Sequence, residues 1–481
     1  MEEERLLNGS DCRLATRLQN IKEVFFVETK KLWQIGGLIV FNVLCAYCID
    51  LVTIIFSGHL GDLELSVVTL SQTVIGNFIF GFLLGMGSAL ETLCGQAYGA
   101  EEISMLGIYL QRSWIILVST SVFLLPLSIF ASPALKLLGQ AAKIAELSGM
   151  YTVLIIPRTF SLAIIFPAQK FLQAQNKVVE LAWIGFAGLI VHVPLTWLLV
   201  FPLNLGLIGC AVAYDITILL IAILQALFVF TLKDAWKGFS WLAFKDLWGF
   251  VRLSLESAVM LCLEVWYFMS LFIVTGNLNN SEIAIDALSI CVNISGILAM
   301  LFIGINAAIS IRVSNELGRG NPRAAKYSVY VTVFQSCIIG LFFMTCVLVA
   351  RDKFPVIFTN SKAVQTAASK LAFLLGICIV LGSVQFVLSG VAVGGGWQAT
   401  VAYINVGCYY IFGLPLGILL GYTANLGVAG IWGGMITGTA LQAVLLLIIV
   451  YKTDWEKEVE QSAERMRKWG EQEPAHPTAD T

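Results

Sequence analysis

Residues Leu253–Val274 read LSLESAVMLCLEVWYFMSLFIV, a largely apolar run that carries one acid near its middle, Glu264. A helix of roughly 20 residues, rising about 1.5 Å per residue, is long enough to cross a bilayer. An ionised carboxylate near the centre of such a helix costs roughly 2.5–3.5 kcal/mol on insertion scales. The pattern therefore predicts that Glu264 faces a water-filled cavity, pairs with another buried polar group or carries protons.

The composition of the whole chain indicates a membrane protein. Of its 481 residues, 58% are hydrophobic and only 12% are charged, which is far more apolar than a soluble domain requires. A net charge of −2, with no basic face, argues against nucleic-acid binding. The cysteines are scattered through apolar runs and the three histidines lie far apart, so we expect no metal site and no bound cofactor.

Twelve apolar runs predict twelve membrane-spanning helices. They cover residues 32–57, 65–90, 106–131, 147–168, 180–202, 207–232, 248–275, 287–311, 327–350, 366–392, 399–421 and 427–451. We expect an N-terminal tail (1–31), a first lobe of six helices (32–232), an inter-lobe linker (233–247), a second lobe of six helices (248–451) and a C-terminal tail (452–481). The N-terminal residues lack the apolar stretch of a removable signal peptide. Basic residues are more frequent in the short loops on the side of the termini, which predicts cytoplasmic termini.

The two halves of the chain repeat one another. Asn204–Gly209 reads NLGLIG, and Asn425–Gly430, 221 residues later, reads NLGVAG. Pro194 and Pro415 are separated by the same number of residues. Parallel six-helix repeats are a common way for transporters to surround a central substrate path, so the repeat predicts a transporter.

Several longer motifs point to one family. They are SGHLGDLEL (Ser57–Leu65), ALETLCGQAYGA (Ala89–Ala100), FLQAQN (Phe171–Asn176), NELGRGNP (Asn315–Pro322) and GGWQA (Gly395–Ala399). Together they resemble the plant branch of the multidrug and toxic compound extrusion (MATE) family, from about Lys31 to Lys457. The resemblance implies an all-α polytopic membrane protein whose twelve transmembrane helices form two pseudo-symmetric six-helix lobes, arranged as a V. It also implies cation-driven antiport of organic compounds.

The resemblance implies a role in proton coupling for two acidic residues, Glu264 and Asp50. Glu264 falls where eukaryotic members keep an acid in the seventh helix that is thought to bind protons. The aspartate that some members have in the tenth helix is replaced here by Gly382. Asp50 lies about one helical turn before the first-helix aspartate of prokaryotic relatives, which aligns near Thr53. We therefore expect Glu264, with Asp50 as second candidate, to couple transport to protons.

The expected substrate cavity is amphipathic, because large planar organic compounds are held by apolar and aromatic surface with a few placed polar groups. An arginine inside the fourth span, Arg158, offers a guanidinium to an anionic substrate; alternatively it forms a salt bridge with Asp50 or Glu91. The other candidates for substrate contact serve equally well as helix-packing or lipid-facing groups. They are Trp266, Tyr267, Asp286, Asn293, Gln385, Gln398, Tyr403 and Asn405.

These features predict a secondary antiporter and not an enzyme. We expect a monomer in the bilayer that exchanges protons for small organic compounds of flavonoid or alkaloid type, or xenobiotics, across the vacuolar membrane, with the plasma membrane as alternative. A channel or uniporter for chloride or organic acids on the same fold is the competing hypothesis. A different twelve-helix carrier is less consistent, because the loop after the second helix reads GQAYGAEE (Gly95–Glu102) and is not rich in Asp and Arg. No nucleotide-binding motif suggests ATP as the energy source.

Overall fold

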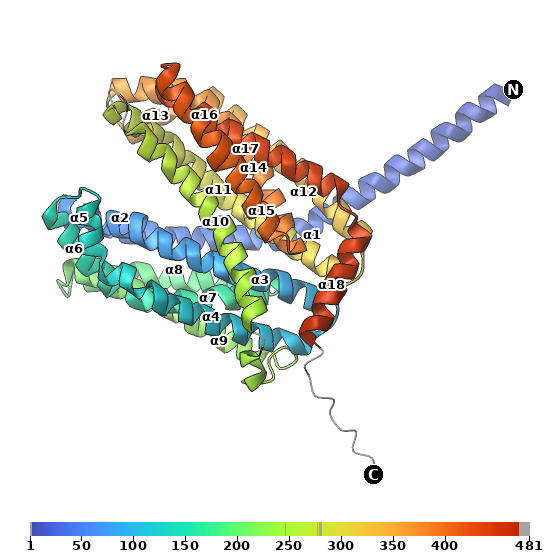
Figure 1. Cartoon of the computed structure of the whole chain (residues 1–481), viewed down its shortest axis with the longest axis horizontal. Coiled ribbons are helices and arrows are strands. Elements are labelled where there is room, and N and C mark those ends of the chain that lie inside the picture. The colour runs from blue at the N-terminus through green and yellow to red at the C-terminus, as the bar shows by residue number, and fades with distance from the viewer. Residues whose placement is uncertain (1, 246, 277, 279–280, 471–481) are drawn as a thin grey trace, which may run out of the picture.

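The computed structural model describes residues 2–245, 247–276, 278 and 281–470, and within these it contains helices and no strand. Met1, Asp246 of the expected linker and residues 471–481 of the expected C-terminal tail lie outside the described residues. Eleven of the described helices are long and apolar enough to cross a membrane, and a bent pair of helices makes a twelfth. The spans form two groups that meet at one end and diverge toward the other, as expected for a V (Figure 1).

The first lobe contains the following elements. They are α1 (Glu2–Leu60), α2 (Asp62–Leu70), the π-helical turn η1 (Ser71–Gly76), α3 (Asn77–Gly99), α4 (Ile103–Ile129), α5 (Ala131–Leu137), α6 (Ala142–Leu154), α7 (Ile156–Ala174), α8 (Val178–Val200) and α9 (Gly206–Thr231). The helices α2, η1 and α3 follow one another without a loop and form one span.

The linker and the second lobe contain the remaining elements. They are the 3-10 turn η2 (Trp241–Phe244), α10 (Leu247–Thr275), α11 (Ser281–Gly318), α12 (Pro322–Val349), α13 (Phe354–Phe358), α14 (Lys362–Gly395), α15 (Gln398–Asn405), the π-helical turn η3 (Val406–Gly413), α16 (Leu414–Ile418), the π-helical turn η4 (Leu419–Thr423), α17 (Gly427–Lys452) and α18 (Trp455–Gly470). The eleventh span therefore runs through α15, η3, α16 and η4.

Three elements differ from the sequence-based expectation. The expected N-terminal tail is not separate, because α1 begins at Glu2 and extends beyond the bundle as one helix (Figure 1). The fourth span is not one straight helix: α6 and α7 meet at a 47° bend at Ile155. Pro157 explains the bend, because proline disfavours helical geometry in the residue before it and leaves a backbone hydrogen bond unmade. The expected C-terminal tail contains a further helix, α18.

Glycines let the two lobes come together at the closed end of the V. Gly99 at the end of α3 lies against the backbone carbonyl of Asn315 in α11, and Gly318 of α11 lies against the carbonyl of Gln96 in α3. A Cβ atom at either glycine would overlap the facing oxygen. Small residues permit such close helix contacts in membranes. The two motifs ALETLCGQAYGA and NELGRGNP therefore form part of the contact between the lobes.

Candidate functional site

Glu264 lies on α10 and is half-buried against two other helices of the second lobe. The hydroxyl of Ser389 on α14 and the amide of Asn405 on α15 each donate to its Oε1 at 3.4 Å. Both donors are neutral, and both distances are long for a hydrogen bond. Among the described residues no lysine or arginine forms an ion pair with Glu264. The carboxylate is thus held by weak polar contacts and has no counter-charge beside it.

Asn405 is itself fixed by a residue that the sequence did not single out. Gln442 of α17 donates from Nε2 to the Oδ1 atom of Asn405 at 2.8 Å. The Asn405 amide also donates to the carbonyl of Met260, 3.3 Å away on α10. Asn405 and Gln442 are both fully buried. A single buried glutamine in an apolar helix gives no signal of its own, because its partner is 37 residues away in the sequence.

Two of the expected substrate contacts support this cluster from within the lobe. Gln385 donates to the hydroxyl of Tyr409 at 2.7 Å. The ring of Tyr409 stacks on that of Tyr267, with centroids 4.2 Å apart and planes within 5°. The Tyr267 hydroxyl donates to the carbonyl of Met435 at 2.7 Å. Tyr267 is therefore a core residue whose polar atom is already bonded.

The other expected contacts are spread over several places. Trp266 is 45% exposed and stacks on Phe78 of α3, with centroids 5.9 Å apart, so this ring bridges the two lobes. Asp286, Asn293 and Tyr403 have exposed side chains, and the Asn293 amide donates within its own helix. The structure brings none of these three to Glu264 through a hydrogen bond.

Gln398 belongs to the closed end of the V and not to the Glu264 cluster. Its amide donates to the hydroxyl of Thr92 on α3 at 2.8 Å. Thr92 in turn donates to the carbonyl of Val393 on α14 at 2.5 Å. These bonds join the lobes where the glycine contacts also lie.

A second polar cluster lies inside the first lobe. The hydroxyl of Tyr214 on α9 donates to Asp50 on α1. The guanidinium of Arg158 on α7 lies over the Tyr214 ring, 5.0 Å from its centroid, and its Nε is buried without a hydrogen-bond partner. The backbone N–H of Arg158 donates to Asp215 at 3.1 Å. Asp50 and Asp215 therefore both lie near Arg158, and Tyr214 contacts both Arg158 and Asp50.

This cluster corrects the two salt bridges that the sequence suggested for Arg158. Among the described residues Arg158 forms no ion pair with Asp50 or Glu91, and Glu91 instead pairs with Lys170 at 2.5 Å. Sequence reasoning missed Asp215, which follows Tyr214 in the sixth span. The signal was present, because an acid within an apolar span is as unusual there as Glu264 is in the seventh.

A buried histidine lies next to this cluster. His192 of α8 is fully buried, and its two ring nitrogens lie 3.0 Å from the Thr53 hydroxyl and 2.9 Å from that of Thr217. Thr53, which aligns near the first-helix aspartate of prokaryotic relatives, thus faces His192, whereas Asp50 faces Tyr214. Asp50 and Thr53 therefore contact different side chains, although they lie about one helical turn apart on α1.

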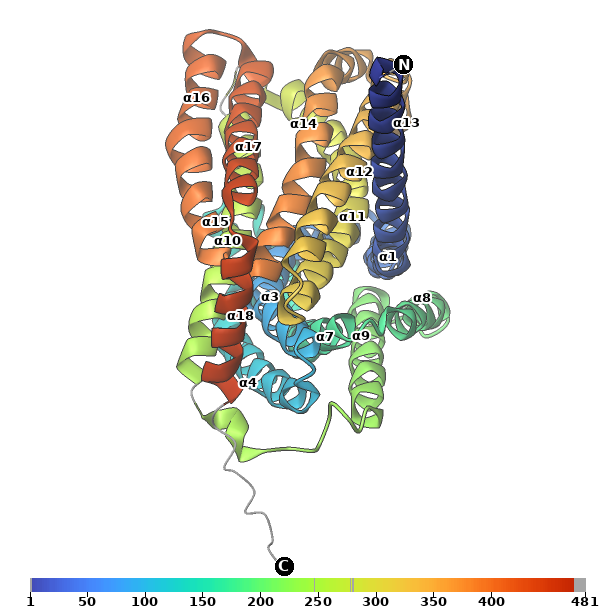
Figure 2. The ribbon, with the colours of Figure 1, turned by 90° about the vertical axis from the view of Figure 1, so that its right-hand side faces the viewer.

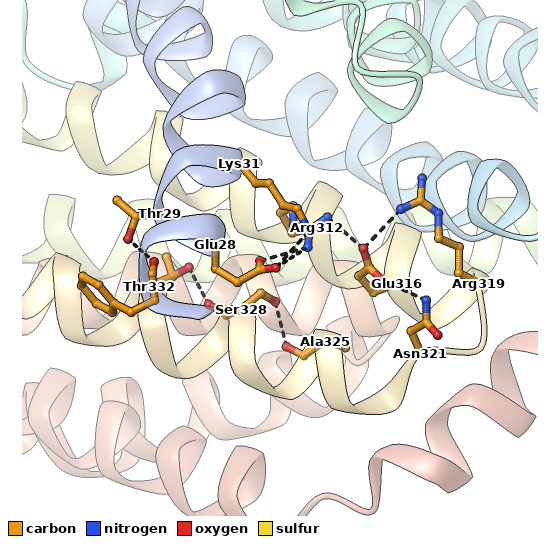
Figure 3. A network of polar contacts seen from close by, with 11 residues as sticks. Glu28, Thr29, Lys31, Arg312, Glu316, Arg319, Asn321, Ala325, Ser328 and Thr332 are labelled. Atoms are coloured by element: carbon orange, nitrogen blue, oxygen red, sulfur yellow. Dashed lines mark hydrogen bonds and ion pairs between the residues drawn. The ribbon is translucent and has the colours of Figure 1, made fainter. Parts of the chain in front are cut away.

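Polar contacts also join the lobes around the closed end. Figure 3 shows Glu28 of α1 beside Arg312 of α11, which also contacts Glu316 of its own helix. The Arg312–Glu28 and Arg312–Glu316 distances are 2.9 and 2.8 Å, and Arg319 adds a contact to Glu316 at 3.2 Å. The side chains of Glu28, Arg312 and Glu316 are all buried.

The C-terminal helix α18 spans the same end of the molecule (Figure 2). Arg465 donates to Oε1 of Gln96 on α3 at 3.1 Å and to the carbonyl of Gly395 on α14 at 3.0 Å. Glu458 accepts a bond from the Trp397 indole at 2.9 Å. Arg465 thus links the first lobe to the second.

The fold and these motifs match proteins of known family. The MatE family model matches residues 39–198 and 257–419, one segment in each lobe. Protein DETOXIFICATION 35 of Arabidopsis thaliana is 62% identical over 452 residues, which cover 94% of this chain and 93% of the relative. Protein DETOXIFICATION 34 of Arabidopsis thaliana is 58% identical, over 94% of this chain and 84% of the relative.

Solved structures of MATE transporters have the same fold as this chain. The eukaryotic MATE transporter AtDTX14 superimposes with a TM-score of 0.87 at 33% identity, covering 92% of this chain and 99% of that one. The Vibrio cholerae MATE transporter VcmN in its bent form superimposes with a TM-score of 0.78 at 16% identity, over 93% and 99%, which supports the fold alone. With one family matched in both lobes and close relatives along nearly its whole length, this chain belongs to the MATE family of membrane transporters.

Proposed function

We propose that this transporter exchanges protons for organic compounds, with Glu264 as the group that binds and releases the proton. The observation that carries the proposal is the setting of the Glu264 carboxylate. It lies in an apolar span, half-buried, and its contacts to Ser389 and Asn405 are neutral and long. A carboxylate with a buried counter-charge stays ionised, whereas one without it can exist in both protonation states.

The arrangement of the lobes supports alternating access. The lobes are joined at the end that contains Thr92, Val393 and Gln398, and they diverge toward α5 and α13 (Figure 1). Because the joined end also carries α18 and the linker, we assign it to the cytoplasm, as the distribution of basic residues predicts. In this assignment the lobes are closed to the cytoplasm, and transport requires the contacts of the closed end to separate.

The proposed substrates are small organic compounds of flavonoid or alkaloid type, or xenobiotics, and the proposed site is the vacuolar membrane, with the plasma membrane as alternative. The names of the DETOXIFICATION relatives are consistent with removal of such compounds. A tagged copy imaged in plant cells distinguishes the two membranes.

A channel or uniporter for anions is the competing function, because Arg158 presents a guanidinium within the first lobe. Chloride and organic acids therefore belong in the substrate panel.

The decisive experiment uses two glutamates of the same helix. Purified protein in liposomes is given a pH gradient, and uptake of a panel of phenolic and alkaloid compounds is measured. Glu264→Gln should abolish gradient-driven uptake while leaving the yield of folded protein unchanged. Glu256→Gln is the matched control, because Glu256 lies two turns earlier on α10 and pairs with the exposed Arg252 at 2.9 Å. Full gradient-driven uptake by Glu264→Gln would refute the assignment, and Asp50→Asn would then be tested in the same assay.

A further inference from the structure

The linker between the lobes carries an exposed aromatic surface that transport itself does not explain. Phe239 and Trp241 are 81% and 85% exposed, and Phe244 of the linker and Trp248 at the start of α10 are exposed as well. Four large aromatic side chains on the surface within ten residues are unusual for a connecting segment. The linker runs from α9 to α10 along the outer edge of the molecule (Figure 2).

The aromatic surface is held in place by the first lobe. The side chain of Gln111 on α4 donates to the carbonyl of Gly238 at 3.0 Å and accepts from the backbone N–H of Ser240 at 2.8 Å. Arg112 donates to the carbonyl of Leu242 at 3.3 Å. Three hydrogen bonds therefore fix the linker to α4, so its aromatic side chains form a surface of defined shape.

A groove of about 330 Å³ lies between the linker and α4, beside the hydrogen bonds that join them. Its walls are mostly apolar and aromatic, and its polar members, Gln111 and Ser240, already bond to each other. It is lined by Gln111, Trp114, Ile115, Phe239, Ser240, Trp241, Ala243 and Phe244. Such a groove suits a hydrocarbon chain better than a polar metabolite.

The position of the groove along α4 places it inside the membrane boundary. The 27 residues of α4 span about 40 Å, whereas the hydrocarbon core of a bilayer is about 30 Å thick. Gln111 is eight residues, or about 12 Å, from the start of α4. A centred helix leaves about 5 Å of α4 outside the core at each end, so Gln111 lies about 7 Å inside the hydrocarbon core, at a depth where acyl chains are found.

The charges around the groove complement an anionic headgroup. Lys233, Lys237 and Lys245 are exposed on the linker. The sequence of the linker also contains Asp234 and Asp246, so three lysines against two aspartates leave it with a small positive net charge. Lysine side chains at this depth extend toward the headgroups, where they meet phosphate and carboxylate groups. The basic and aromatic groups lie on one short segment, which allows one lipid molecule to contact both.

We propose that this groove binds an anionic phospholipid of the cytoplasmic leaflet. One acyl chain lies between α4 and the linker, against Trp241 and Phe239, and the headgroup lies by Lys237 and Lys245. The lipid would then fix the segment that connects the lobes to the first lobe and to the membrane surface. In this arrangement the second lobe moves relative to a linker that stays in place.

The test uses the full chain in nanodiscs of phosphatidylcholine with a photo-reactive phosphatidylserine whose acyl chain carries a diazirine. Cross-linked peptides, identified by mass spectrometry, should come from the linker and from α4 near Trp114. Lys237→Gln with Lys245→Gln should lower this labelling about tenfold, since each lysine near an anionic surface contributes to binding. Both side chains are exposed, so this variant should elute as folded protein in size-exclusion chromatography.

Two controls make the result specific. Lys136→Gln with Lys143→Gln removes the same charge from the opposite end of the first lobe and should leave labelling unchanged. Trp241→Ala should reduce labelling by reactive phosphatidylserine, whereas Trp183→Ala, at an exposed position on α8, should not. The proposal is overturned if the two linker lysines can be neutralised without loss of labelling, or if reactive phosphatidylcholine labels the groove equally well.

Discussion

Glu28 of α1 and Arg312 of α11 form a buried ion pair between the two lobes, with 2.9 Å between oxygen and nitrogen. Arg312 also pairs with Glu316 at 2.8 Å, so a single guanidinium binds two carboxylates (Figure 3). Removing one partner of a buried pair costs about 3–5 kcal/mol, because the other charge is left uncompensated. Replacement of Glu28, Arg312 or Glu316 therefore leaves a different set of buried charges without a partner, and should cost a different free energy of unfolding.

This difference gives an ordered prediction for stability. Arg312→Gln removes the buried cation that Glu28 and Glu316 share and leaves them with Lys31 and Arg319, which are about half exposed and lie 3.2 Å away, whereas Glu28→Gln leaves Arg312 paired with Glu316. We expect Arg312→Gln to lower the thermal unfolding midpoint clearly more than Glu28→Gln. The double variant Glu28→Gln/Arg312→Gln should recover part of the loss. Equal midpoints for the two single variants would contradict this order, and midpoints equal to that of the parent protein would mean that the pair does not stabilise the lobe contact.

Arg465 gives a prediction for the opening of the closed end. Arg465→Gln removes two bonds that link Gln96 and Gly395, each of which contributes about 0.5–1.5 kcal/mol. In a variant whose eleven native cysteines are replaced, a cysteine placed at Ser314, which is buried where the lobes meet, reports separation of the lobes by its rate of labelling with a maleimide. We expect labelling about tenfold faster, equivalent to roughly 1.4 kcal/mol. Arg467→Gln, at an exposed position of the same helix, should leave the rate unchanged.

Gln442 gives a prediction for proton coupling. Gln442→Leu leaves the Oδ1 atom of Asn405 buried and without its partner, at a cost of about 1–3 kcal/mol. The Asn405 amide is then free to turn away from Glu264, so the pH dependence of uptake should shift while maximal uptake at the new optimum is largely retained. Gln225→Leu, which alters an equally buried glutamine of the first lobe, should leave the pH profile unchanged. A pH profile that is the same for Gln442→Leu and the parent protein would exclude a positioning role.

Arg158 gives a prediction for substrate charge. If its guanidinium contacts an anionic substrate, Arg158→Gln should raise the half-saturation concentration for anionic compounds and leave neutral and cationic ones nearly unaffected. If its role is to balance Asp50 and Asp215, the variant should be unstable and should regain stability when Asp50→Asn is added. Uptake across a charged and uncharged panel, together with the unfolding midpoint, separates the two outcomes.

Most of the fold follows from the sequence because each span carries its own signal. Apolar runs mark the helices, and the repeat of NLGLIG as NLGVAG marks the two halves. The bend at Ile155 is not visible in hydropathy, because the apolar run continues through it; Pro157 is its only sign in the sequence of this span. The continuation of α1 to Glu2 could not be read from hydropathy, because polar residues form helix as readily as apolar ones.

The side-chain contacts are less predictable, because they depend on how helices rotate against each other. Glu264 and Asn405 were both singled out for their polarity, and the structure brings them together. Gln398 was chosen on the same grounds, yet it faces Thr92 at the lobe contact. Without the partner helix, the sequence does not determine which polar residues of a span share an environment.

The π-helical turn η3 begins directly after Asn405 and extends to Gly413. A π-helical turn holds one residue more than an α-helical turn, and each residue of an α-helix turns the chain by about 100°. Conversion of η3 to α-helix would therefore rotate Asn405 relative to everything that follows Gly413, with little change in the length of the span. The direction in which Asn405, the side chain that contacts Glu264, points relative to the rest of the eleventh span thus depends on whether the segment next to it is π-helical or α-helical.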